Sequence, residues 1–328
     1  MIPFSVLDLS LITEGGSPST AFANSRDLIQ HAEKLGFNRY WVAEHHAMPG
    51  IASAATSVLI GHLASVTHTI RVGAGGIMLP NHAPLVIAEQ FGTLEALYPG
   101  RIDLGLGRAP GSDPITARAL RRRAESADQF PQDVLELMHY FEPPVPGQAV
   151  VATPGAGAEV PIWLLGSSLY SAHLAAQLGL PFAFASHFAP HQMEEAIALY
   201  RSQFRPSEHL AQPYVMLAAN IIAADTSAQA QRLLTSLQMY FVALRRGRPR
   251  AFPAPVAPES LEWSPAESGI LQSTLSCTFA GDVSAVGADI RSFLNRYQPD
   301  ELLIAAPIFD HAARRHSLEL AVKAREAL

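Results

Sequence analysis

Short apolar runs alternate with segments of helical period along the whole chain, and this alternation constrains the fold more than any other feature of the sequence. The expected strand and helix pairs are 4–9 with 21–35, 40–43 with 54–67, 71–77 with 84–98, 101–107 with 130–141, 162–165 with 168–178, 182–185 with 190–204, 214–223 with 227–246, and 301–306 with 311–328. Strands that alternate with helices lie parallel, and eight parallel strands can close around a filled interior. The sequence therefore predicts an α/β fold, a (β/α)8 barrel.

An open, doubly wound sheet is the alternative architecture, but it would leave edge strands, and none of the eight runs is markedly more polar than the others. A length of 328 residues and a hydrophobic content of 48% suit one barrel domain over residues 1–328.

Two insertions interrupt the alternation, after the fourth and seventh strands. Residues 143–161 are expected to include a short antiparallel ribbon around 149–152. Residues 248–278 contain five prolines and precede an expected helix at 284–297. At the catalytic rim of a barrel such a segment is commonly a lid, although a passive surface loop would carry the same composition.

Charge and cysteine content narrow the class of function. The net charge of -6 argues against non-specific binding of nucleic acid or anionic membrane, since both require a basic surface. The one cysteine, Cys277, excludes an internal disulfide framework and is expected to be a packed residue, which fits a reducing cytoplasm. Neither a signal peptide nor a run of roughly 18 apolar residues is evident, so a cytoplasmic enzyme acting on small molecules is expected.

Polar and glycine residues gather where the expected strands end, which is where (β/α)8 barrels carry their active sites. After the second strand come Glu44, His45 and His46, and the third ends in Gly75 and Gly76. The later strand ends supply Arg108, then the turn Gly166, Ser167, Ser168, Tyr170 and Ser171, then His187, and finally Arg314. Adjacent glycines let a flat ligand approach the backbone, and a helix start rich in hydroxyls suits a phosphate. The set predicts a site for a phosphorylated planar ligand.

These motifs have other interpretations. The two histidines could be structural, and the Gly-Ser-Ser turn could be a plain helix cap. A metal site is not expected, because consecutive residues seldom converge on one ion and the sequence has no HExxH motif. The stretch GLGRAPG lacks the G-x-G-x-x-G spacing of a dinucleotide fingerprint.

Three stretches together resemble the bacterial luciferase-like flavin monooxygenase family, in particular its single-chain, alkanal monooxygenase alpha-chain-like subgroup. They are WVAEHH, the run from VGAGGIMLPNH to GLGRAPG, and LLGSSLYSAHLAAQLGLPFAFA. The resemblance implies reduced FMN, O2 activated through a C4a-hydroperoxyflavin, and a separate flavin reductase. It implies catalysis by His45 with Glu44 and His46 beside it, a flavin ring backed by Gly75 and Gly76, and phosphate contacts from Arg108 and the 166–171 turn.

The sequence also departs from bacterial luciferase. The reactive cysteine on the fourth-strand side is absent, since Cys277 lies in the second insertion, so light emission is not implied. A single chain favours a homodimer, formed through helices of the second and third units. The expected substrate is a small aldehyde-like or apolar molecule in a pocket lined by Leu7, Met78, Phe188 and Trp263. The alternatives are a deazaflavin (F420)-dependent hydride-transfer enzyme and a non-catalytic flavin-binding protein.

Overall fold

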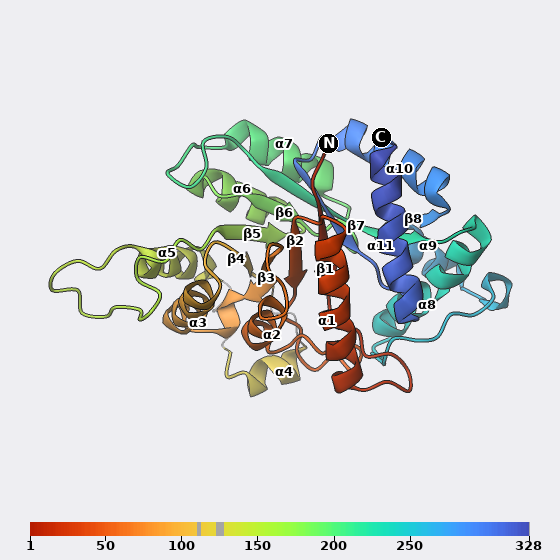
Figure 1. The fold of residues 1–328 in the computed structure, drawn as a ribbon, viewed down its shortest axis with the longest axis horizontal. Coiled ribbons are helices and arrows are strands. Elements are labelled where there is room, and N and C mark those ends of the chain that lie inside the picture. Colours follow the sequence, from red (N-terminus) through yellow and green to blue (C-terminus); the bar gives the residue numbers. More distant parts are fainter. Residues whose placement is uncertain (110–112, 123–127, 328) are drawn as a thin grey trace.

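Eight parallel strands close into a barrel in the computed structural model, which describes residues 1–109, 113–122 and 128–327 (Figure 1). The barrel strands are β1 (Phe4–Asp8), β2 (Arg39–Val42), β3 (Arg71–Met78), β4 (Ile102–Gly107), β5 (Ile162–Gly166), β6 (Phe182–Phe184), β7 (Val215–Ala223) and β9 (Glu301–Ala305). Each pairs with the next along the chain, β7 pairs with β9, and β9 pairs with β1. The barrel has no open edge, so the predicted (β/α)8 fold is confirmed.

The helices expected after the strands are all present, with ends within three residues of those predicted. They are α1 (Pro18–Lys34), α2 (Thr56–Ala64), α3 (Pro84–Leu97), α5 (Phe130–Phe141), α6 (Leu169–Leu178), α7 (Met193–Gln203), α8 (Ser227–Arg245), α10 (Val283–Tyr297) and α11 (His311–Glu326). Local sequence explains several starts: Ser17 caps α1 ahead of Pro18, and Asp310 caps α11. None of the helices in the described part of the chain is both long and apolar enough to cross a bilayer.

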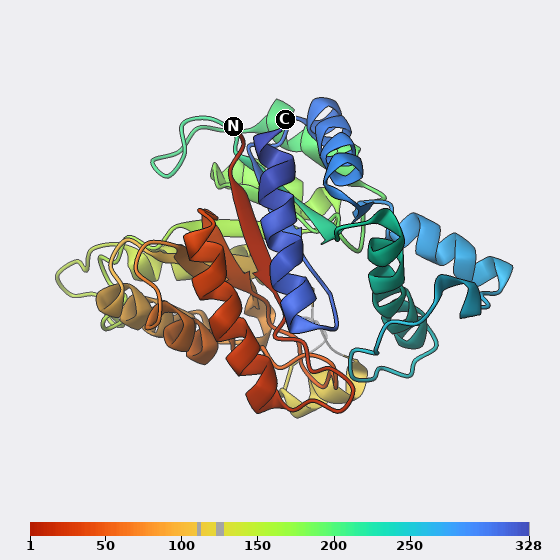
Figure 2. The same ribbon diagram turned by 45° about the vertical axis from the view of Figure 1, so that its right-hand side comes forward.

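The carboxyl ends of the strands lie opposite the chain termini. Figures 1 and 2 show both termini at one end of the barrel and the short helix α4 (Pro114–Ala119), which follows β4, at the other. The polar groups that follow the strands are therefore gathered around one mouth, as the barrel prediction required. Residues 110–112, which include the end of the GLGRAPG motif, lie outside the described residues.

The insertions differ from the prediction in two places. The ribbon expected around 149–152 is wrong, because the Gln148 side chain bonds the backbone at Val145 and Val150, and the Ala152 carbonyl accepts from the Ala156 N–H. These turn contacts use the backbone groups that a ribbon would have paired.

An unpredicted ninth strand, β8 (Thr278–Gly281), pairs with the last four residues of β7, Asn220–Ala223. It follows the unpredicted helix α9 (Pro265–Thr274), which a capping box between Ser264 and Glu267 begins. Upstream of α9, Phe252 exchanges backbone hydrogen bonds of 2.8 Å with Ile12 and Glu14 in the loop after β1. The segment 248–278 therefore borders the mouth, and its role as a lid stays a prediction.

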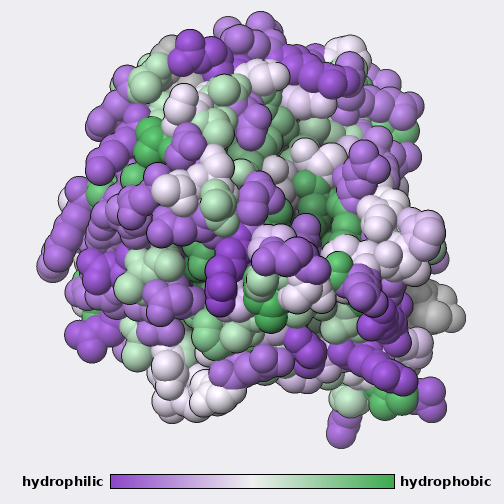
Figure 3. All heavy atoms as spheres, turned by 90° about the vertical axis from the view of Figure 1, so that its right-hand side faces the viewer, coloured by the Kyte–Doolittle hydropathy of each residue, from purple (hydrophilic) through white to green (hydrophobic). Residues whose placement is uncertain are grey.

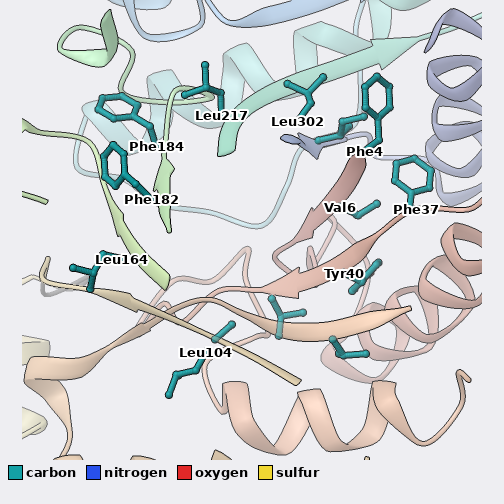
Figure 4. Close-up of a cluster of buried hydrophobic side chains, with 14 of the residues drawn as sticks. Phe4, Val6, Phe37, Tyr40, Leu104, Leu164, Phe182, Phe184, Leu217 and Leu302 are labelled. Carbon is teal, nitrogen blue, oxygen red and sulfur yellow. The ribbon is translucent and has the colours of Figure 1, made fainter. Parts of the chain in front are cut away.

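Two layers of side chains fill the barrel and its surroundings. Alternate strand residues point outward and pack under the helices, among them Phe4, Val6 and Tyr40 (Figure 4). Inside the barrel, Trp41 and Trp163 meet edge to face with ring centroids 5.2 Å apart. These layers close the middle of the barrel, so it is a packed core below its mouth.

A buried ion network closes the amino end of the barrel. The Arg39 guanidinium lies 2.8 Å from the Asp103 carboxylate and 3.0 Å from that of Glu301. Burial lowers the pKa of Arg39, but the two carboxylates outweigh burial, and the net shift is upward. Charged side chains paired with one another therefore occupy this end of the barrel interior.

Candidate active site

Glu44 is the centre of a hydrogen-bond network at the mouth. Its carboxylate is 1% exposed and contacts Nε2 of His46 at 2.7 Å and Nε2 of His82 at 2.9 Å. It also accepts from the Met78 backbone N–H at 2.9 Å and the Asn81 side-chain amide at 3.0 Å. Burial raises the pKa of Glu44, but the hydrogen bonds from His82, Asn81 and His46 outweigh burial, and the net shift is downward. An ionised carboxylate thus joins the ends of β2 and β3.

The end of β3 forms an open backbone surface at the two adjacent glycines. The Gly75–Gly76 peptide bond is cis, and the pairing of β3 with β4 shifts register between Gly75 and Ile77. A Cβ at Gly75 would lie 2.8 Å from the Trp41 ring, and one at Gly76 would lie 2.6 Å from the carbonyl oxygen of Gly105. Only glycine fits at either position, and both residues are partly exposed, so a flat ligand can approach this backbone.

Four small residues belong to the buried cluster inside the barrel that contains Trp41. They are Ala43, directly after β2, and Ala183, Ala218 and Ala305, in β6, β7 and β9. Methyl groups therefore stand at several positions where other barrels carry large branched residues.

Two histidines at the mouth have buried ring nitrogens without a partner. Nδ1 of His45, after β2, and Nδ1 of His187, after β6, make no hydrogen bond within the described residues. Burial lowers the pKa of His45, and burial together with the nearby His45 lowers the pKa of His187 to about 3. Both imidazoles are therefore neutral at pH 7 and keep a free nitrogen for a ligand or a proton.

Arg108 and Tyr170 meet beside the start of α6. The Arg108 guanidinium carbon lies 4.0 Å from the centre of the Tyr170 ring, so this cation–π contact joins the ends of β4 and β5. Ser168 is the N-cap residue of α6, and its side chain makes no capping hydrogen bond. The first N–H groups of the helix, its dipole and Arg108 together form a cationic corner suited to a phosphate.

Comparisons of the sequence and of the fold with known proteins point to the same family. The family model described as luciferase-like monooxygenase matches residues 2–268. The chain belongs to the luciferase-like monooxygenase family. A luciferase-like monooxygenase of Escherichia coli (strain K12) is 56% identical over 328 residues, which cover 100% of this chain and 98% of that protein. The predicted family and the predicted enzyme class are confirmed.

Further relatives agree with this placement. The N-acetyl-S-alkylcysteine monooxygenase of Bacillus subtilis (strain 168) is 36% identical over 255 residues, 76% of this chain and 75% of that protein. The crystal structure of apo-MsnO8 matches with a TM-score of 0.87 and 31% identity, covering 100% of this chain and 99% of that one. Both comparisons therefore agree with the family given by the sequence model.

Most of the predicted site residues of this luciferase-like monooxygenase lie at the mouth, but their environments differ. Glu44, His45 and His46 follow β2, as expected. Ser171 is buried, and its side chain occupies the space where a Cβ at Gly166 would lie, so its hydroxyl belongs to the turn itself. Arg314, one of the strand-end groups, is instead buried in an ion pair at 2.8 Å with Asp8, the last residue of β1, so its charge is already neutralised.

The expected substrate walls are only partly brought together. Leu7 packs inside the barrel with the tryptophans, and Met78 meets Glu44 through its backbone. Phe188 is 42% exposed beside His187, whereas Trp263 lines a separate cavity. As predicted, Cys277 is a buried free thiol, and burial raises its pKa to about 11. It is a packed residue and not a nucleophile at neutral pH.

Sequence reasoning assigned no individual role to two residues that the structure places in the Glu44 network. They are Asn81 and His82, which follow β3 in the stretch LPNH. Their position at strand ends was visible in the sequence, but their partners were not. Within the described residues, no group of three or more histidine, cysteine or acidic side chains is arranged to hold a metal ion.

Proposed function

We propose that this chain is an FMN-dependent monooxygenase that uses reduced flavin and O2 to oxidise a small aldehyde-like or apolar organic substrate. The observation that carries the proposal is the open Gly75–Gly76 backbone of β3 together with the Arg108 and Tyr170 corner at the ends of the neighbouring strands β4 and β5. Family membership supplies the monooxygenase chemistry.

The residues present fit a flavin phosphate. The ring would lie against Gly75 and Gly76, where an added Cβ has no room. The phosphate would meet Arg108, the hydroxyls of Ser167 and Ser168, and the start of α6, with Tyr170 stacked on the guanidinium. When bound, reduced FMN supplies the electrons that activate O2.

The chain's own groups would control protons and water. The neutral His45 imidazole can accept a proton through its unpartnered nitrogen, and His45 stands close enough to His187 to help lower the pKa of His187. Glu44 holds His46 and the β3 end in place through its hydrogen bonds. The ion network around Arg39 fills the amino end of the barrel, so the mouth is the expected route for water.

Partners follow from this chemistry. A separate flavin reductase would supply reduced FMN, in the cytoplasm, where the free thiol of Cys277 stays reduced. Thioethers are worth screening beside aldehydes, because the Bacillus subtilis relative is named for N-acetyl-S-alkylcysteine.

The test is anaerobic titration of the protein with reduced FMN, followed by admission of air and measurement of oxygenated product. We expect saturable binding, and Arg108→Ala should raise the Kd by about tenfold or more, since it removes a charge-assisted phosphate contact. Arg232→Ala is the matched control, because Arg232 is exposed on α8 and is not one of the residues proposed to contact the phosphate. Preferential binding of the deazaflavin would favour hydride transfer instead, and FMN binding without any oxygenated product would favour a flavin-binding protein.

We also propose that a second copy of the chain covers α2 and α3. Val58 on α2 is 74% exposed and Leu97 on α3 is 62% exposed, and the two helices are neighbours. Exposed apolar side chains on adjacent helices are typical of an interface. We expect a homodimer in sedimentation velocity, and Val58→Glu with Leu97→Glu should shift it to monomer. An unchanged sedimentation coefficient in this double variant would place the interface elsewhere.

A further inference from the structure

A second cavity, separate from the barrel mouth, lies between α8 and the segment that follows it. Its volume is about 390 Å³, within the range of roughly 300–1,000 Å³ that small-molecule pockets occupy. Its lining residues are Met239, Val242, Ala243, Arg246, Arg248, Arg250, Leu261, Glu262 and Trp263. No barrel strand contributes to this lining, so the cavity is not part of the site proposed for flavin. Figure 3 shows this side of the molecule, where hydrophobic residues lie in a hollow bordered by hydrophilic ones.

The cavity combines an apolar and aromatic wall with a concentration of positive charge. Three arginines line it against one carboxylate, that of Glu262, although the chain as a whole has a net charge of -6. Arg246 is paired with Glu267 at 2.6 Å and Arg250 with Glu14 at 3.5 Å. Arg248 makes no ion pair with any residue that the structure describes.

The paired arginines are held in place while Arg248 keeps its charge available. Arginine recognises carboxylates and phosphates through two parallel hydrogen bonds, and its flat guanidinium also stacks on rings. The side chain of Trp263 is partly exposed in the same cavity, so it offers a face for stacking. A ligand matched to this lining has a ring and an anionic group.

We propose that this cavity binds a small aromatic anion, a carboxylate or phosphate ester on a planar ring, with the ring on Trp263 and the charge on Arg248. The site is distinct from the mouth, but the segment that forms it contacts two of the loops at the mouth. The carbonyl of Arg250 lies 2.8 Å from where a Cβ on Gly50 would stand, in the loop that follows the Glu44 stretch. Phe252, two residues on, is bonded to the loop after β1.

The probe is 2-naphthoate, titrated calorimetrically into the full chain with and without saturating FMN. We expect saturable binding with a Kd of about 1 mM or tighter, the affinity usual for a ligand with this number of heavy atoms. Neutral 2-naphthamide should bind at least about tenfold more weakly, because it cannot use the guanidinium charge. Added FMN should leave the affinity unchanged, since the two sites share no residue.

Matched variants locate the site. Arg248→Ala should raise the Kd by about tenfold or more, and Arg248→Lys should give an intermediate value because it keeps the charge but loses the bidentate contact. Arg245→Ala is the control, since this neighbour is exposed and does not line the cavity. The proposal would be overturned if 2-naphthoate did not bind saturably, or if the amide bound equally well. It would also be overturned if Arg108→Ala or added FMN abolished binding while Arg248→Ala did not.

Discussion

His45→Ala should lower the rate of substrate oxygenation by about 10²- to 10⁴-fold, the usual size of a general acid–base contribution. The reason is the free Nδ1 of a buried imidazole at the mouth, which alanine cannot replace. Burial lowers the pKa of His45, so the neutral form persists at acid pH. The acid limb of the wild-type rate profile should therefore lie below the ordinary histidine value of 6.5 and be absent in the variant.

The measurement is a single-turnover assay with preloaded reduced FMN, O2 and excess substrate, followed across pH. Affinity for reduced FMN should change little, because the proposed ring and phosphate contacts come from other residues. His62→Ala, an exposed histidine on α2, is the matched control. Product formation at the wild-type rate in His45→Ala would assign the proton transfer to another group.

Asp8→Ala should lower the free energy of unfolding by about 3–5 kcal/mol, the cost of leaving a buried charge without its partner. The Asp8 carboxylate is fully buried and accepts from Arg314 at 2.8 Å, from the Tyr40 hydroxyl at 2.6 Å and from Ser25. It thereby ties β1 and β2 to α1 and α11. Alanine would leave the Arg314 guanidinium buried and positive in an apolar interface.

Urea unfolding of the two proteins tests this, with Asp27→Ala as the control. Asp27 pairs with His311 between the same two helices but is about half exposed, so its loss should cost about 0–1 kcal/mol. Burial raises the pKa of Asp8, but Arg314 and the hydroxyls lower it below 3.8. The stability that Asp8 provides is present above that value and is lost as pH falls through its folded pKa. Equal losses in the two variants would contradict the expectation.

Much of the fold was predictable because it depends on local period. Alternating apolar strands and helical segments identified the eight barrel strands and the helices that follow them. The start of α1 was predicted three residues late, because the Ser17 cap ahead of Pro18 was not used. The ninth strand was not predicted, because its sequence TFAG is short and it pairs only with the last four residues of β7. The ribbon at 149–152 failed because a single side chain, Gln148, satisfied the backbone in another way.

The sequence by itself determined that Glu44, His45, Gly75, Gly76 and Arg108 stand at strand ends and so around one mouth, since parallel strands of a closed barrel end on the same face. Only the tertiary structure decided which of these groups meet. Glu44 joins His82 across 38 positions, Arg108 covers Tyr170, and Arg314 turns away to Asp8. The physical reason is that strand and helix periods are local, whereas side-chain partners depend on barrel register, loop paths and burial, which arise only when distant segments pack together.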